Sequence, residues 1–314
     1  MRSLNVGVIG AGFMGQRHIR TYLSRPNCSL IGIVEQDDAK LKDLRDAFSV
    51  PVYKDLSYLL DDVDAVSIAT PASTHYELAK FLLENKKHVL LEKPMAYTTS
   101  QAWDLIKTAR VNNVILAIGH IERFNPVVDS LCELIRREQP LFIEIHREGP
   151  YDPRIFDVDV IMDFMIHDLD LLVHLFEDRL VLKSAYGISV FSDKTDVVNA
   201  QLVEKNGMLI NVTSSRASEQ RKRQWRLLFH NKTIEIDLFN RKISCFNKKD
   251  GLTRNISDHY SSVDPLTLEI DDFLKSVIGG SRPTVDGTQG FNALFLSEKI
   301  QTAVNRQNSD LMAI

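Results

Sequence analysis

Three residues of this chain have side chains suited to acid–base chemistry, and each lies in a distinctive local context. Lys93 directly follows an apolar run and is itself followed by Pro94. Asp163 and His167 are four residues apart in the segment 161–176, whose apolar pattern predicts an amphipathic helix. Side chains four residues apart stack on one helix face, where a carboxylate can tune an imidazole that titrates near neutral pH. These three residues are the candidate catalytic group.

Asp170 and His174 extend the same predicted helix face, seven and eleven residues beyond Asp163. Two histidines and two aspartates on one face could bind a metal, but this spacing is not specific for a ligand set, and we expect no metal. The plainer alternative makes Asp170 and His174 polar residues of the helix surface. For Lys93 the corresponding alternative is a solvent-facing lysine in a turn.

A glycine-rich loop near the N-terminus is the strongest binding motif. Gly10, Gly12 and Gly15 form G-x-G-x-x-G directly after an apolar run and before a helical pattern. In this context the first glycine permits a tight turn, the second allows the backbone to approach a diphosphate, and the third allows close packing of helix on strand. The amides of Phe13 and Met14 then face the diphosphate at the positive end of the helix.

A single carboxylate bears on which dinucleotide this loop binds. Glu35 lies twenty residues beyond Gly15, where it could accept hydrogen bonds from an adenosine ribose. It would also repel a 2′-phosphate, and no Arg or Lys follows in 36–38. We therefore predict NAD in preference to NADP, with a solvated charge at a strand end as the alternative for Glu35.

Two further turns follow apolar runs and should border the cofactor crevice, because ligands of open parallel sheets bind outside the carboxyl ends of the strands. They are 69–75 and 91–94. The candidate cofactor-binding residues in these turns are Thr70, Pro71, His75, Glu92 and Lys93.

The predicted strands and helices that must position these residues follow two different orders along the chain. Up to about residue 120, apolar runs alternate with helical windows, which predicts a doubly wound parallel sheet. The expected strands are 4–9, 30–34, 65–69, 88–91 and 114–118, and the expected helices are 13–24, 38–48, 55–61, 74–86 and 98–112. We assign residues 1–121 to a Rossmann dinucleotide-binding domain.

After this point the helices no longer alternate with strands. We expect a helix at 126–138, a strand at 141–147, a helix at 160–176, successive strands over about 180–255, and helices at 265–278 and 287–304. Strands that follow one another without helices predict an antiparallel sheet. The fold class is α/β, with an α+β second domain over 122–314 that holds the substrate, catalytic and oligomerisation surfaces.

Composition excludes several classes of protein. The chain has 314 residues, a formal charge of −4 and a pI near 6.2, which provides no basic field for nucleic acid. We see neither a signal peptide nor a run of ~20 apolar residues that would cross a membrane. Three scattered cysteines indicate neither a disulfide framework nor a metal cluster. We expect a cytoplasmic protein with no nucleic-acid or membrane partner.

The glycine loop, the Glu92-Lys93-Pro94 turn and the Asp163-x-x-x-His167 segment occur in an order that resembles the Gfo/Idh/MocA family of sugar and inositol dehydrogenases. The resemblance covers nearly the whole chain. It implies a Rossmann domain followed by an open, mostly antiparallel sheet, a cis Lys93-Pro94 bond and an NAD cofactor. It also implies that Lys93, Asp163 and His167 act on a sugar hydroxyl.

A narrower resemblance lies in 119–126, 147–150 and 166–170, which look like the UDP-N-acetylglucosamine 3-dehydrogenase branch of this family. That branch oxidises the sugar 3-hydroxyl before a partner aminotransferase installs an amine. A diphosphate substrate would need arginines, and the run 216–226 supplies several on alternating faces of a strand. The predicted substrate-binding residues are Lys93, His120, Arg123, Asn125, Arg154, Asp163, His167 and Arg216. For the basic run and for Arg123, an ordinary structural or solvated role is the alternative.

Other functions remain open on the sequence alone. The chain could oxidise a free sugar or inositol, act as a glycosidase that retains NAD, or sense NAD without catalysis. The combination of Lys93, Asp163 and His167 argues against the last, because a binding module needs no acid–base group. By resemblance we also expect a homodimer or homotetramer.

Overall fold

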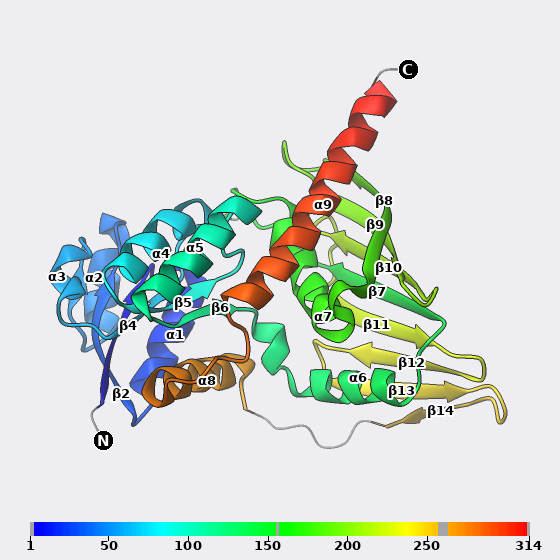
Figure 1. Cartoon of the computed structure of the whole chain (residues 1–314), viewed down its shortest axis with the longest axis horizontal. Coiled ribbons are helices and arrows are strands. Elements are labelled where there is room, and N and C mark those ends of the chain that lie inside the picture. Colours follow the sequence, from blue (N-terminus) through cyan, green and yellow to red (C-terminus); the bar gives the residue numbers. More distant parts are fainter. Residues whose placement is uncertain (1–2, 155–156, 257–262, 313–314) are drawn as a thin grey trace. The chain divides into compact units, whose positions relative to one another are not determined.

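The computed structural model describes residues 3–154, 157–256 and 263–312. The chain forms two compact units, each of which is built from two separate stretches of sequence. The first comprises Met1–Ile121 and Val263–Phe291, and the second comprises Glu122–Ser262 and Asn292–Ile314. Figure 1 shows the elements of both.

The first unit contains a six-stranded parallel sheet in the order β3-β2-β1-β4-β5-β6, which is the Rossmann order. Its strands are β1 (Leu4–Ile9), β2 (Cys28–Val34), β3 (Val52–Tyr53), β4 (Ala65–Ile68), β5 (His88–Glu92) and β6 (Leu116–Gly119). The predicted parallel sheet is confirmed. The sequence did not predict β3, because two residues are too few to show a pattern.

Helices connect these strands and cover the sheet. They are α1 (Phe13–Leu23), α2 (Asp38–Ala47), α3 (Ser57–Leu60), α4 (His75–Glu84), α5 (Thr99–Asn112) and α8 (Pro265–Gly279), with a short 3₁₀ helix η1 (Ala72–Thr74). Side chains fix two of the helix starts, since Asp37 accepts from the Ala39 amide and Thr98 from the Gln101 amide.

Helix α8 differs from the domain division that the sequence predicts. Residues 263–291 belong to the first unit, although we assigned 122–314 to one second domain. Leu266, Ile270, Phe273 and Leu274 of α8 are buried in the core of the first unit. The apolar stripe of a helix predicts that one face is buried, but it does not identify the core that covers that face.

The second unit contains an eight-stranded sheet in the order β14-β13-β12-β11-β7-β10-β9-β8. The strands are β7 (Phe142–Glu148), β8 (Leu180–Ile188), β9 (Val197–Glu204), β10 (Leu209–Ser215), β11 (Lys222–Leu228), β12 (Lys232–Asp237), β13 (Lys242–Asn247) and β14 (Leu252–Asn255). The central pair β7 and β10 is parallel, and the other paired strands are antiparallel. The predicted, mostly antiparallel sheet is therefore confirmed.

One face of this sheet is packed against helices in a single apolar core. The helical elements are η2 (Ile121–Phe124), α6 (Pro126–Arg137), the π-helical turn η3 (Ile161–Met165), α7 (Ile166–Phe176), η4 (Glu177–Arg179) and α9 (Gly287–Met312). Helix α9 begins in the first unit and continues in the second from Asn292. In the described ranges, no helix has the length and apolar character needed to cross a membrane.

Candidate active site

The glycine loop has the geometry that its spacing predicts. Gly10 has a φ of +86°, which favours glycine. A Cβ on Gly15 would lie 1.9 Å from the Gly10 carbonyl oxygen, so only glycine lets α1 approach this closely. A Cβ on Gly12 would meet nothing within 4 Å, which leaves open space beside the start of α1. This is the space that a diphosphate needs next to the first amides of a helix.

Glu35 holds the loop in this shape. Its Oε2 accepts from the Ala11 amide at 2.9 Å and its Oε1 accepts from the Asp37 amide at 3.0 Å. The half-buried carboxylate therefore lies against the glycine loop, at the end of β2. Phe13, the first residue of α1, is 70% exposed beside Gly12. The loop, the amides of α1 and this carboxylate together fit a dinucleotide such as NAD.

His75 joins the two turns that the sequence assigned to the cofactor crevice. Its imidazole is buried, with Nδ1 bonded to the Pro94 carbonyl oxygen at 2.8 Å and Nε2 to the Thr70 carbonyl oxygen at 3.0 Å. Pro71 precedes η1, and the Thr70 hydroxyl is bonded to the Thr74 hydroxyl. The ring of His75 lies between the two turns and holds them together, and its contact with the cofactor stays a prediction.

Glu92 ends a buried hydrogen-bonded chain that the sequence analysis missed. The Tyr22 hydroxyl is 2.7 Å from Ser67 Oγ, Ser67 Oγ is 3.1 Å from His18 Nδ1, and His18 Nε2 is 3.0 Å from Glu92 Oε1. An imidazole that accepts from Ser67 at Nδ1 and donates to Glu92 at Nε2 satisfies every member. Glu92 thus links α1 to the turn of Lys93, and its contact with the cofactor stays a prediction.

Glu269 lies beside this chain of buried groups, and Tyr22 begins it. Glu269 of α8 offers a carboxylate oxygen within 4.8 Å of the His18 and Glu92 ligand atoms. Burial raises the pKa of Tyr22, so its hydroxyl stays protonated and able to donate. The spacing of His18 and Tyr22, four residues apart on α1, was the available sequence signal, because it puts both on one helix face.

Lys93 immediately follows β5 in a turn that contains a cis peptide bond to Pro94, as predicted. The residue is half-buried, so it is not a freely solvated surface lysine. His120, another predicted substrate residue, directly follows β6 and is buried. Its amide donates to the Ile118 carbonyl oxygen at 2.8 Å.

Asp163 and His167 belong to the second unit and occupy an irregular helix start. Asp163 is buried within the π-helical turn η3, and half-buried His167 lies in the first turn of α7. The sequence predicted one continuous α-helix here. π-Helical turns are rare and occur frequently at functional sites. Asp159 stabilises the turn, because its Oδ1 accepts from the Ile161 and Met162 amides at 3.0 Å each.

Asp170 is buried, so the alternative that makes it a polar residue of the helix surface is wrong. Its side chain is 1% exposed and lies 3.4 Å from Nη1 of Arg123, whose side chain is 4% exposed. Burial raises the pKa of Asp170 to about 7, against the lowering effect of Arg123. Arg123, a predicted substrate residue, makes this buried contact, and its part in substrate binding stays a prediction. His174, by contrast, is exposed.

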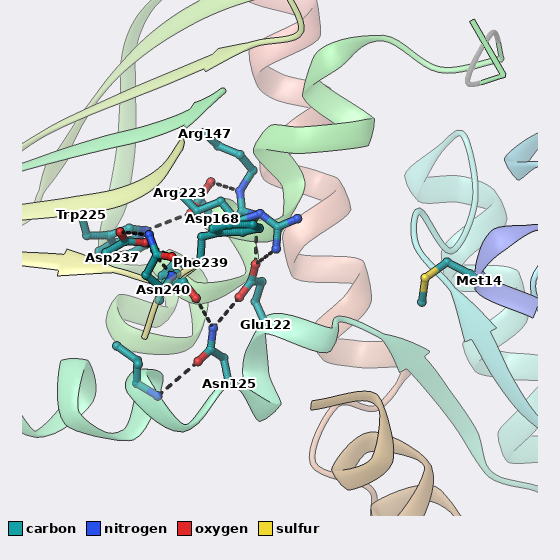
Figure 2. Close-up of polar contacts among 12 residues, drawn as sticks. Met14, Glu122, Asn125, Arg147, Asp168, Arg223, Trp225, Asp237, Phe239 and Asn240 are labelled. Atoms are coloured by element: carbon teal, nitrogen blue, oxygen red, sulfur yellow. Dashed lines mark hydrogen bonds and ion pairs between the residues drawn. The ribbon is translucent and has the colours of Figure 1, made fainter. Parts of the chain in front are cut away.

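A buried ionic network surrounds Asp168, the residue next to His167 (Figure 2). Arg147 makes a bidentate contact with Asp168, with Nε at 2.6 Å from Oδ2 and Nη2 at 3.1 Å from Oδ1. Glu122 Oε1 accepts from Nη1 of both Arg147 and Arg223 at 3.0 Å. The indole of Trp225 donates to Asp168 Oδ1 at 2.9 Å. Burial alone would raise the pKa of Glu122, but Arg147 and Arg223 hold it below its usual value.

Asn125 is part of the same network. Its amide nitrogen donates to Glu122 Oε2 at 3.1 Å and to the Leu238 carbonyl oxygen at 3.0 Å. Its side-chain oxygen caps α6 by accepting from the Val127 amide. These contacts give the buried side chain of Asn125 a structural role, and its part in substrate binding stays a prediction (Figure 2).

The remaining predicted arginines, Arg216 and Arg154, also pair with carboxylates. Arg216 is buried, donates to Asp196 Oδ1 at 2.6 Å and also bonds the Val158 carbonyl oxygen and the Ser192 hydroxyl. These bonds hold Arg216 just beyond the end of β10, and its contact with substrate stays a prediction. The side chain of Arg154 is 77% exposed and pairs with Asp152.

Known proteins resemble this chain along most of its length. A family model described as an oxidoreductase family with an NAD-binding Rossmann fold matches residues 4–120. The UDP-N-acetylglucosamine 3-dehydrogenase of Acidithiobacillus ferrooxidans is 31% identical and covers 97% of this chain and 98% of its own. The chain belongs to the Gfo/Idh/MocA family. The myo-inositol 2-dehydrogenase of Thermotoga maritima is 26% identical, over 98% of both chains.

Solved structures have the same fold. The structure of the A. ferrooxidans dehydrogenase superposes with a TM-score of 0.87, covering 97% of this chain and 98% of that one. A levoglucosan dehydrogenase solved with NADH has a TM-score of 0.85 over 97% and 98% of the two chains, at 18% identity, a level that bears on the fold alone. As a Gfo/Idh/MocA oxidoreductase, this chain is an NAD-binding protein.

Proposed function

We propose that this protein is an NAD-dependent dehydrogenase that oxidises the 3-hydroxyl of UDP-N-acetylglucosamine to the 3-keto nucleotide sugar. The observation that carries the proposal is the similarity to a UDP-N-acetylglucosamine 3-dehydrogenase along nearly the full length of both chains. The half-buried Lys93 and His167 and the buried Asp163 supply the acid–base groups that such a reaction requires.

Each of these residues has a defined part in the proposed reaction. His167 takes the proton of the 3-hydroxyl as general base. Lys93 hydrogen-bonds the same oxygen and stabilises its developing negative charge. Asp163 orients His167 or the neighbouring hydroxyl. The glycine loop, the first amides of α1 and Glu35 hold NAD, which when bound accepts the hydride from the sugar carbon.

A substrate panel tests this function directly. Purified protein is incubated with NAD and, in turn, UDP-N-acetylglucosamine, UDP-N-acetylgalactosamine, free hexoses and inositol, and NADH is followed by its absorbance. A keto trap or a coupled aminotransferase pulls the equilibrium forward. NADH formation with the UDP-N-acetylhexosamines alone is the expected result.

The second candidate is oxidation of inositol or a free sugar, which the similarity to a myo-inositol 2-dehydrogenase favours. Turnover of inositol or a free hexose, with no turnover of either nucleotide sugar, would replace the first proposal by this one. The family and the NAD chemistry would stand in both cases.

The open face of the second sheet supports a homo-oligomer as part of the proposal. Val181, Leu209 and Phe246 are 42%, 52% and 43% exposed there. Strand register aligns them in one row across the sheet, through β9, β7, β11 and β12. A row of exposed apolar side chains is typical of a contact surface, and we propose that a second copy of this chain covers it.

A further inference from the structure

A nucleotide sugar carries a diphosphate, and the structure separates the arginines that can bind it from those that cannot. Arg123, Arg147 and Arg216 are buried against carboxylates. Arg154 pairs with Asp152 in an exposed turn. The first three guanidinium groups are buried away from any ligand, and Nε and Nη2 of Arg154 are both used by Asp152. The remaining candidates are the three arginines Arg221, Arg223 and Arg226 at strand β11.

Strand alternation divides these three between opposite faces of the sheet. Arg226 lies on the open face, where its Nη2 is 2.8 Å from a carboxylate oxygen of Glu144 on β7. Arg223 lies on the same face as buried Trp225, which is bonded to Asp168 beside His167. Arg223 and His167 are therefore connected within one unit through Trp225 and Asp168.

The Arg223 side chain is held in place and still has free donors. Its Nη1 is fixed by Glu122 at 3.0 Å, and its guanidinium carbon lies 5.7 Å from the ring centroid of Phe239. The side chain nevertheless remains 37% exposed. Among the residues that the structure describes, none accepts a hydrogen bond from Arg223 Nε or Nη2. Figure 2 shows Arg223 beside Arg147 and Glu122.

Arg221 is exposed and lies close to both Arg223 and the π-helical turn. A Cβ on Gly149 would be 3.3 Å from the Phe164 ring and 3.8 Å from Cγ of Arg221, so both side chains lie beside this glycine. Phe164 directly follows Asp163. Burial and the nearby guanidiniums of Arg147 and Arg221 lower the pKa of Arg223, although it remains charged at neutral pH.

We propose that Arg221 and Arg223 form the diphosphate-binding pair of this protein, an assignment that rests on the proposed nucleotide-sugar function. Two adjacent guanidinium groups present planar sets of donors that match the oxygens of successive phosphates. Arg223 is the preorganised member, because Glu122 and Phe239 fix its side chain before any ligand arrives. Arg221, which is exposed, completes the pair.

Calorimetric titration of the NAD-loaded protein with UDP tests this pair without requiring turnover. We expect Arg221→Gln and Arg223→Gln each to weaken UDP binding by about 10-fold or more, and the double variant by about 100-fold, the range for lost hydrogen bonds to a charged group. Arg226→Gln, on the opposite face of the same strand, is the matched control and should bind UDP like the unmodified protein.

Arg223 also neutralises buried Glu122, so thermal unfolding of every variant is measured in parallel. Arg223→Lys keeps the charge but loses the planar fork, and it should bind UDP with intermediate affinity. If Arg223→Gln does not fold, Arg221→Gln and Arg223→Lys decide the question.

The outcomes distinguish this inference from the function on which it rests. Unchanged UDP affinity in Arg221→Gln and Arg223→Gln, or an equal loss in Arg226→Gln, would overturn the arginine pair and leave the nucleotide-sugar function intact. Absence of UDP binding by the unmodified protein would overturn both.

Discussion

At the scale of single residues, the proposed reaction makes His167 of the second unit its general base. His167→Ala should lower kcat by ~10²–10⁴, the contribution of a general base, and should leave NAD affinity nearly unchanged. Steady-state kinetics and NAD titration measure the two effects. Turnover equal to that of the unmodified protein would remove His167 from the reaction.

Gly12 and Gly15 of the cofactor loop should respond differently to substitution by alanine, because their surroundings differ. Gly12→Ala should leave the unfolding temperature unchanged and weaken NAD binding, since the added methyl enters open space beside the α1 amides. Gly15→Ala should destabilise the fold by about 1–3 kcal/mol, because its methyl collides with the Gly10 carbonyl.

Thermal unfolding and NAD titration of the two variants test this difference. A large loss of stability in Gly12→Ala, or none in Gly15→Ala, would contradict the roles assigned to these glycines.

Single residues could be predicted from the sequence where a local backbone motif defines them, but not where their partners are distant in the chain. The glycine loop and the cis Lys93-Pro94 turn were predicted correctly, because backbone motifs are local. The carboxylate partners of the arginines could not be predicted, since sequence gives no measure of which carboxylate meets which guanidinium. Arg123 and Arg216 pair with Asp170 and Asp196, which lie 47 and 20 residues away.

At the scale of elements, helix α7 is held by two buried carboxylates on either side of Leu169. Asp168 binds Arg147, and Asp170 contacts Arg123. Both contacts fix the helix that carries His167. The sequence predicted this helix correctly but not its π-helical start, because apolar periodicity reports which side chains are buried and not how the backbone is wound.

Asp170 makes the stability of this arrangement depend on pH. Its pKa is raised to about 7 in the folded protein from an ordinary value near 3.8. The folded state therefore binds more protons than the unfolded state between these values, and the stability contributed by this group falls as pH rises from about 4 to about 7. The loss should be on the order of 1–4 kcal/mol.

Urea unfolding at about pH 5 and about pH 8 isolates this contribution when Asp170→Asn is the comparison. The unmodified protein should lose more stability than Asp170→Asn between the two pH values. An equal pH dependence in both proteins would show that Asp170 does not titrate in this range.

At the scale of the whole molecule, the open face of the second sheet predicts how copies of the chain associate. Leu209→Asp places a charge in the exposed apolar row and should convert the oligomer to a monomer, because a buried unpaired charge is strongly unfavourable. Size-exclusion chromatography with light scattering measures the mass. Val111→Asp, at an 84% exposed position of α5 in the first unit, is the control and should not change it.

A monomeric unmodified protein, or an unchanged mass for Leu209→Asp, would contradict this contact surface. The sequence could predict that the second sheet has one buried face. It could not predict the row itself, which depends on the register of seven strands.

The return of α8 to the first core also constrains how this chain can fold during synthesis. The first core is completed only when residues 263–291 have left the ribosome, although its six strands end at Gly119. Until then the nascent Rossmann sheet lacks the helix that covers part of its apolar surface. The intervening second unit must therefore emerge, and can begin to fold, while the first is still incomplete, so the order of folding need not follow the order of the sequence.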